Sequence, residues 1–65
     1  MGEYHIVVTT QSQIQPERVI DAIATRLLDD DIESFTITIF KFRRDDGEIE
    51  IEPVASLQWL NGEKQ

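Results

Sequence analysis

A single histidine is the side chain of this 65-residue sequence best suited to acid–base chemistry. His5 stands in a short run of aromatic and β-branched residues, whereas a catalytic histidine usually works beside a carboxylate or a second metal ligand. No nucleophile motif accompanies it. We therefore interpret His5 as a polar residue on the exposed or interface side of a strand, and we assign no catalytic residue.

A group of acidic side chains near the middle of the chain offers oxygen ligands of the kind that Ca²⁺ or Mg²⁺ prefers. Its members are Asp29, Asp30, Asp31 and Glu33. The spacing of an EF-hand is absent, and consecutive residues cannot all converge on one ion without an unusual turn. Since the chain has no cysteine, thiolate sites are excluded too. We predict no metal or cofactor, and interpret the aspartates as a solvated turn or an acidic contact for a basic partner.

A row of glutamates follows at alternate positions, Glu48, Glu50 and Glu52. On a strand these side chains share one face at intervals of about 6.6 to 6.8 Å, twice the rise per residue. Such a row could imitate a polyanion. The hairpin register described below sets Lys41 and Arg43 opposite it, which favours a salt-bridged solvent face.

The charge balance limits the classes of partner. Thirteen acidic against six basic residues give a formal net charge of −7, which repels phosphate backbones and anionic lipid headgroups. We therefore expect no direct binding to nucleic acid. The sequence also lacks a long apolar segment and a signal-peptide pattern, so we expect no association with a membrane. The absence of cysteine fits a reducing compartment and many secreted chains alike, and we place the cytoplasm first.

The elements that position these groups begin with a strand and a helix. Residues 4 to 10 are rich in β-branched and aromatic types, which predicts a strand. Pro16 suits the first position of a helix, and apolar residues then recur at helical spacing as far as Leu28. We expect the helix to stop at the aspartates that follow, since they are unfavourable at the negative end of the helix dipole.

A hairpin is predicted next, from a strand over residues 35 to 44 and a third strand over residues 48 to 52. The Asp46-Gly47 pair is a strong hairpin turn signal. With a two-residue loop, the pairs are Phe42 with Ile51, Arg44 with Ile49, Arg43 with Glu50 and Lys41 with Glu52. A four-residue loop preserves the alternation. Either register gathers apolar side chains on one face and opposite charges on the other.

The second strand contains a conflict in its alternation. Phe35, Ile37 and Ile39 occupy odd positions, whereas Phe40 and Phe42 occupy even ones, so one face cannot hold all five. Either a bulge lies near Ile39, or both faces of the sheet are covered. One helix can cover only one face of a small sheet, so the second alternative requires another chain.

These elements predict a single α+β domain over residues 1–65 with two layers, in the order β-α-β-β. One helix packs on a three-stranded mixed or antiparallel sheet, and a right-handed crossover makes the first two strands parallel. Pro53 ends or bends the third strand, and residues 54 to 60 form a short helix or a fourth strand. We expect disorder at residues 1–3 and 63–65.

This order of elements is similar in layout to tautomerases of the 4-oxalocrotonate type, which assemble into oligomers. The motif of that family has a proline directly after the initiator methionine, which serves as an N-terminal amine base. Gly2 occupies that place here. The resemblance therefore implies no catalytic residue in this chain, and we assign no family from it.

The function class that these observations favour is a small acidic module for protein–protein interaction or regulation. It docks a partner protein or copies of itself as a homodimer or higher oligomer. The short length also favours self-association, because small domains without disulfides or metals often gain stability by forming oligomers. The alternatives are a structural subunit of a homo-oligomer and, less favoured, a small enzyme whose active site forms between subunits.

The predicted contact residues fall in three groups. Trp59 with Leu57 and Leu60 follows the hairpin, where an aromatic residue serves either as a binding hot spot or as a lid on the core of its own chain. The second group is Ile37 and Ile39, buried between copies together with Val7 in the homo-oligomer alternative. The third is the acidic run Asp29, Asp30 and Asp31, which steers a basic partner by charge.

Overall fold

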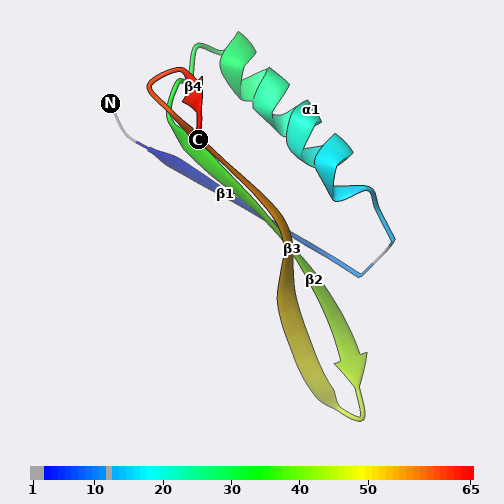
Figure 1. Cartoon of the computed structure of the whole chain (residues 1–65). Helices are drawn as coiled ribbons and strands as arrows, with labels where there is room; N and C mark the ends of the chain where they lie inside the picture. Colours follow the sequence, from blue (N-terminus) through cyan, green and yellow to red (C-terminus); the bar gives the residue numbers. More distant parts are fainter. Residues whose placement is uncertain (1–2, 12) are drawn as a thin grey trace.

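A computed structural model describes residues 3–11 and 13–65, in which one helix lies on a four-stranded mixed sheet (Figure 1). The elements are β1 (Tyr4–Thr10), α1 (Pro16–Asp29), β2 (Phe35–Asp45), β3 (Glu48–Leu60) and β4 (Glu63–Lys64). The α+β class is confirmed. The sheet has one strand more than the predicted three, because the chain turns back once more after β3.

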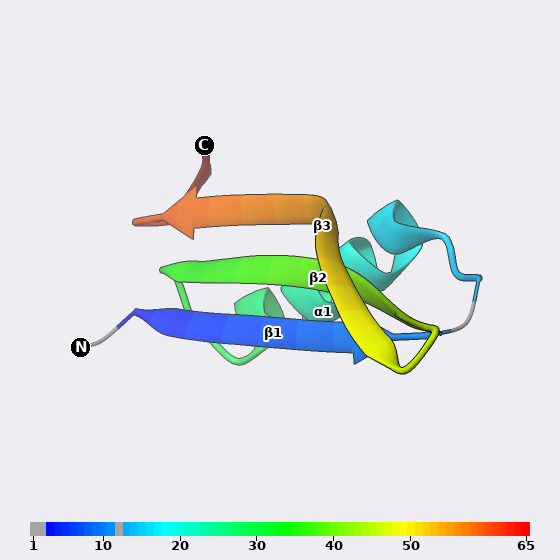
Figure 2. The same ribbon diagram turned by 90° about the horizontal axis from the view of Figure 1, so that it is seen from below.

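The strands lie in the order β1-β2-β3-β4, and Figure 2 shows the first three side by side with α1 behind them. β1 is parallel to β2, as predicted, and the other neighbours are antiparallel. The third strand therefore lies outside the first two, and β1 is left as an edge strand.

Helix α1 begins at Pro16 and ends at Asp29, as its sequence predicts. Its apolar stripe buries Ile20 and Ala24 against the sheet. The backbone of α1 comes closest to β2 and β3, so the helix is displaced toward the β3 side of the sheet. Ile6 and Val8 of β1 reach the core only as half-buried side chains at its margin.

The core is centred on β2. Phe35, Ile37 and Ile39 are the most fully buried large side chains, and all three face the helix. Leu57 and Trp59 of β3 pack beside them from the opposing strand. This side of the sheet holds the hydrophobic contacts that stabilise the isolated chain.

The hairpin between β2 and β3 has the predicted two-residue turn. Asp46 and Gly47 both have positive φ, 49° and 82°, as a type I′ turn requires. Glycine suits the second position because it has no Cβ to clash at positive φ. The register is confirmed as well, with Phe42 opposite Ile51 and Arg43 opposite Glu50.

A β-bulge is present near Ile39, but it lies on β3 and does not bring the five apolar residues of β2 onto one face. The register shifts between Ile39, which lies opposite Ala55, and Phe40, which lies opposite Pro53, so Val54 is the extra residue on β3. The bulge predicted near Ile39 is therefore confirmed. β2 itself keeps its alternation, and this places Phe40 and Phe42 on the face away from α1.

Residues 54–60 form neither a helix nor a separate strand. They continue β3 beyond the bulge to Leu60, because a bulge accommodates Pro53 without ending the strand.

The end of the chain differs from the expectation of disorder. Asn61 and Gly62 have positive φ and turn the chain back, so that Glu63 and Lys64 pair with β3. The backbone N–H of Gln65 also donates to the Gln58 carbonyl at 2.9 Å. The expectation for residues 63–65 is wrong, because Asn61-Gly62 acts as a second hairpin turn. At the other end, residues 1 and 2 lie outside the described residues.

Candidate functional site

The hairpin projects from the rest of the molecule as a two-stranded arm, visible at the lower end of Figure 1. Pairing between β1 and β2 stops at Lys41, opposite Thr10, whereas β2 continues to Asp45. We call residues 42–51 the arm. It contributes to an elongated molecule with extents of 43 × 21 × 18 Å.

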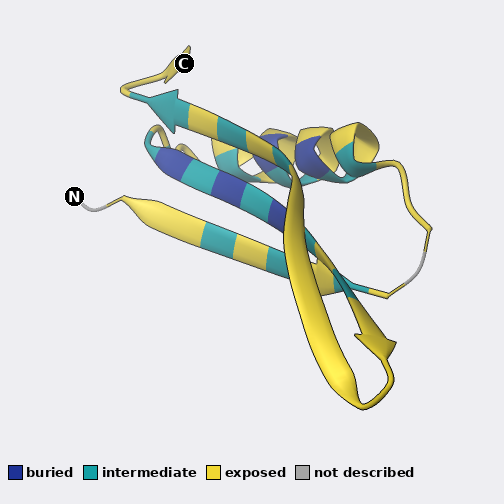
Figure 3. Ribbon diagram, turned by 60° about the horizontal axis from the view of Figure 1, so that its bottom comes forward, coloured by how far each residue is buried: buried dark blue, intermediate teal, exposed yellow. Residues whose placement is uncertain are grey.

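One face of the arm is mainly apolar, and Arg44 is the charged residue on it. Phe42 lies opposite Ile51 and Arg44 opposite Ile49, while Phe40 and Pro53 lie opposite each other at the base. The exposed fraction is 57% for Ile49 and 60% for Ile51. We call Phe42, Ile49 and Ile51, together with Phe40 at the base of the arm, the arm face. These side chains lie on the side of the sheet away from α1, and the arm is almost wholly exposed in Figure 3.

The other face of the arm carries the predicted charges. The Arg43 guanidinium donates from Nε and Nη2 to Glu50 Oε2 at 3.2 and 3.1 Å, and Lys41 lies opposite Glu52. Both partners of the Arg43 ion pair are mostly exposed, so its contribution to stability is small. Its position confirms that the glutamate row is partly neutralised across the hairpin.

Toward β1 the open face of the sheet becomes more polar. It is formed there by Thr36 and Thr38 of β2 and by His5, Val7 and Thr9 of β1. Val7 is 63% exposed. The apolar part of the open face is therefore concentrated on the arm, and Val7 is a separate exposed apolar residue on β1.

Two of the predicted contact residues are not available to a partner. Ile37 and Ile39 have exposed fractions of 0% and lie beneath α1. The prediction that they are buried between copies is wrong. The reason is the unbroken alternation of β2, which turns its odd-numbered residues toward the helix and turns Phe40 and Phe42 away from it.

Trp59 belongs to the core of its own chain. Its ring stacks on Phe35 with centroids 5.9 Å apart and planes 5° from parallel. Leu57 packs against the same core, and Leu60 is half-buried at the strand end. Of the two roles considered for Trp59, the packing favours the lid on the core. The indole Nε1 is buried and has no hydrogen-bond partner among the described residues.

The acidic run lies at the end of α1. Asp29, Asp30 and Asp31 are exposed, and the Arg26 Nε donates to Asp30 Oδ2 at 3.2 Å. Figure 1 places this end of the helix far from the arm. Within the described ranges, no three His, Cys, Asp or Glu side chains are grouped as metal ligands.

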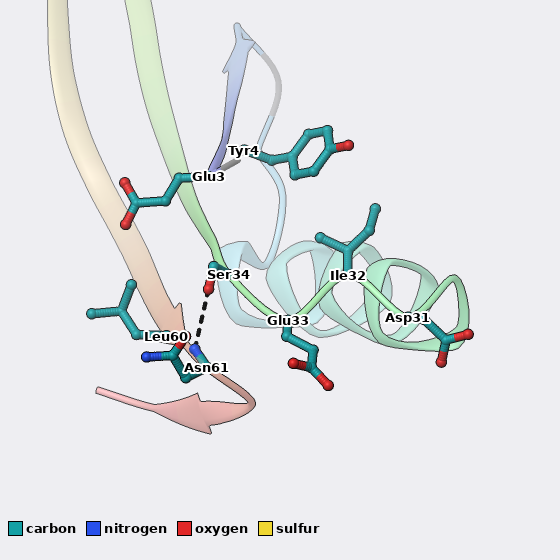
Figure 4. A pocket seen from close by; sticks show the side chains of 8 residues that line it. All are labelled: Glu3, Tyr4, Asp31, Ile32, Glu33, Ser34, Leu60 and Asn61. Atoms are coloured by element: carbon teal, nitrogen blue, oxygen red, sulfur yellow. Dashed lines mark hydrogen bonds between the residues drawn. The ribbon is translucent and has the colours of Figure 1, made fainter. Parts of the chain in front are cut away.

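A shallow hollow of about 740 Å³ lies beside the acidic run, between the start of β1 and the turn after β3. The backbone N–H of Asn61 donates to Ser34 Oγ at 3.1 Å and joins the two sides. Figure 4 shows Glu3, Asp31 and Glu33 at its rim pointing in different directions. These carboxylates do not converge on a common ligand position.

His5 lies on the open face near the N-terminal end of β1. Its Nε2 is 3.9 Å from Glu3 Oε2, and both side chains are mostly exposed. This is a loose surface contact, which offers neither the burial nor the fixed hydrogen bond of a general base held in position.

Sequence reasoning did not select the arm face as a contact surface. Its signal was present in two features: the even-numbered Phe40 and Phe42, and a second strand longer than the first. Together they mean that, among residues 3–11 and 13–65, neither a strand nor a helix lies beside part of the hairpin.

Comparison with known proteins adds no assignment. No family model matches the chain, and no match was found among curated proteins or solved structures. Across residues 3–11 and 13–65, no helix has the length and apolar character needed to cross a bilayer.

Proposed function

We propose that this protein is a protein-association module that docks a partner protein through the arm face. The observation that carries the proposal is the exposure of Ile49 and Ile51, both more than half accessible, on a hairpin whose other side is charged. Burying a large aliphatic side chain contributes about 1.5 to 3 kcal/mol. Two such residues beside half-buried Phe42 offer a small but concentrated contact.

The construction of the arm supports this role. A two-stranded hairpin alone is only marginally stable in water, and this one extends beyond both β1 and the helix. A partner lying on the arm face would supply the second apolar layer that the arm lacks. The Arg43–Glu50 pair on the opposite side keeps that side polar, so only one side of the arm is suited to a hydrophobic partner.

The charge of the molecule indicates which partners bind fastest. A net charge of −7 attracts basic surfaces at long range. The acidic run at the end of α1 lies away from the arm, so it steers the encounter and does not form part of the contact. We infer a partner with an apolar groove or patch on a basic surface, with association that weakens as salt rises.

The proposal is tested with the double variant Ile49→Thr/Ile51→Thr. Threonine keeps the β-branched shape and the strand preference while removing apolar surface. The matched control is Glu50→Thr/Glu52→Thr, which alters the same strand on its charged side. Each tagged protein is used to capture partners from the cells of origin, with the fold checked by circular dichroism.

We expect the isoleucine variant to retain its fold and lose at least about tenfold in captured partner, as the loss of two hot-spot contacts implies. The glutamate variant should keep hydrophobic capture. Equal capture by the wild type and the isoleucine variant would show that the arm face is not the docking surface.

A further inference from the structure

The outer edge of β1 is built differently from a protected sheet edge. Natural proteins shield edge strands with lysine, proline, bulges or covering segments. The seven residues Tyr4–Thr10 contain no Lys, Arg, Asp, Glu or Pro, and β1 pairs regularly with β2 along its whole length. Among the residues that the structure describes, no strand pairs with its outer side.

The backbone geometry shows which groups face outward. The Tyr4 N–H donates to the Ser34 carbonyl at 3.2 Å, in the register that aligns Tyr4 with Phe35. In a parallel ladder alternate residues direct their N–H and C=O groups to the same neighbour. The even-numbered residues of β1 therefore bond to β2, and His5, Val7 and Thr9 direct their backbone groups away from the sheet.

We propose that a second copy of this chain pairs with β1 in antiparallel orientation, about a two-fold axis through Val7. In this register Val7 lies opposite Val7 of the second copy, and His5 lies opposite its Thr9. Every outward-facing backbone group of His5, Val7 and Thr9 then has a partner, as in a regular antiparallel ladder. The two sheets become one continuous sheet with both helices on the same face.

The side chains agree with this register. Ile6 and Val8 face the helix side but are only half-buried, because α1 lies over β2 and β3. In the dimer Ile6 lies opposite Val8 of the second copy, so a row of four apolar side chains fills the space between the two helices. On the open face, Val7 meets its own copy and the polar His5 meets a threonine. No like charges oppose each other along the ladder.

Charge also argues for a second copy over an unrelated basic strand. The acidic side chains belong mainly to the arm and to the end of α1, and β1 itself has none. Two copies still repel each other through their net charge of −7, and salt screens that repulsion. The dimer should therefore become tighter as salt rises, which is the opposite of the behaviour proposed for the arm face with a basic partner.

This inference goes beyond the docking function, because it uses the edge of the sheet rather than the arm face. The two-fold axis directs the two arms toward opposite ends of the dimer. Docking would then be bivalent, and linked sites can raise the apparent affinity for a repeated partner well above that of one arm.

The test uses two double variants of the full chain that differ in one side chain. His5→Lys/Thr9→Lys sets lysine opposite lysine at both ends of the ladder. His5→Glu/Thr9→Lys sets glutamate opposite lysine in the same places. Within one chain the two positions lie on the same strand four residues apart, so neither variant opposes its own charges.

Sedimentation equilibrium over a dilution series gives the dimer constant of each protein. We expect a concentration-dependent dimer for the wild type, and a dimer about tenfold weaker for the lysine pair than for the glutamate–lysine pair. The lysine pair lowers the net negative charge, so its weakening cannot come from general repulsion. Between about 0.05 and about 0.5 M salt, the wild-type dimer should tighten.

Amide hydrogen exchange provides a second readout that does not depend on substitution. The amides of His5, Val7 and Thr9 should be protected at high protein concentration and exchange faster on dilution, while those of Ile6 and Val8 stay protected throughout. A wild-type monomer at all concentrations, or a dimer that both variants weaken equally, would overturn the proposal without bearing on the arm face.

Discussion

Trp59 stacks on Phe35 across the pair β2 and β3, with ring planes 5° from parallel and centroids 5.9 Å apart. The stack lies near the end of the core where α1 finishes. It joins the central strand to the last long strand, beyond which β4 and the second turn are attached. Stacked aromatic pairs add about 0.5 to 1.5 kcal/mol beyond the area that they bury.

Trp59→Ala should destabilise the chain by about 3 to 5 kcal/mol, as large aromatic truncations in a core do. Trp59→Phe should cost far less, because it keeps a stacking ring and removes the indole N–H that is buried without a partner among the described residues. Urea unfolding of both variants checks this. A loss for Trp59→Phe as large as for Trp59→Ala would contradict the expectation that a smaller stacking ring can replace the indole.

Isoleucines on the two faces of the sheet should respond differently to the same truncation. Ile37 is 0% exposed and Ile51 is 60% exposed. Ile37→Ala should therefore cost about 2 to 5 kcal/mol in unfolding free energy, and Ile51→Ala less than about 1 kcal/mol. The comparison is made at a concentration low enough to avoid association, and equal costs would contradict the assigned faces.

Gly47→Ala should loosen the arm without unfolding the core. The φ of +82° at Gly47 favours glycine, and alanine there costs about 1 to 2 kcal/mol. Since the arm projects from the core, we expect the cost to fall on local opening. Arm amides such as those of Arg43 and Glu50, which lie opposite each other in the hairpin, should exchange about five to thirty times faster, while the Ile37 amide changes little.

The matched control for this prediction is Gly62→Ala. Gly62 has the same φ, but its turn joins only the two residues of β4 to the sheet. Exchange in the arm should be the same as in the wild type. If Gly47→Ala instead lowers the protection of Ile37 as much as that of the arm, the hairpin and the core unfold as one unit.

Removing the Arg43–Glu50 contact should have little effect on the folded chain. Both side chains are more than half exposed, and exposed ion pairs are weakened by solvent and salt. Glu50→Gln keeps the size of the side chain and a hydrogen-bond acceptor. We expect a midpoint of urea unfolding close to that of the wild type, and a marked shift would indicate that this pair is a main source of the rigidity of the arm.

Much of the fold follows from local signals in the sequence. Pro16 and the aspartates after Leu28 predict both ends of α1, and Asp46-Gly47 predicts the hairpin with its register. These features depend on the conformational preferences of a few adjacent residues. The second turn at Asn61-Gly62 carries the same kind of signal, but the strand after it pairs only through Glu63 and Lys64, and so short a strand has no alternation to recognise.

The faces of the sheet were harder to predict, because they depend on one unpaired residue. Val54 shifts the alternation of β3, so that Leu57 and Trp59 face the helix while Ile49 and Ile51, also odd-numbered, face away. The residues around Pro53 do not indicate whether the extra residue lies on β2 or on β3. The sequence therefore predicts a bulge near Ile39, but not that Ile37 and Ile39 are enclosed while the isoleucines of the arm are exposed.

The extra residue at Val54 has a consequence for how this protein can vary. Downstream of it, the odd-numbered positions of β3 face α1, whereas upstream, toward the turn, the odd-numbered positions face away from α1. Substitutions on the arm can therefore accumulate without disturbing the packing beneath α1. Deleting Val54 would give all of β3 one alternation. The residues that face a partner on the hairpin and those that pack beneath α1 would then follow a single register, and the two surfaces could no longer change independently.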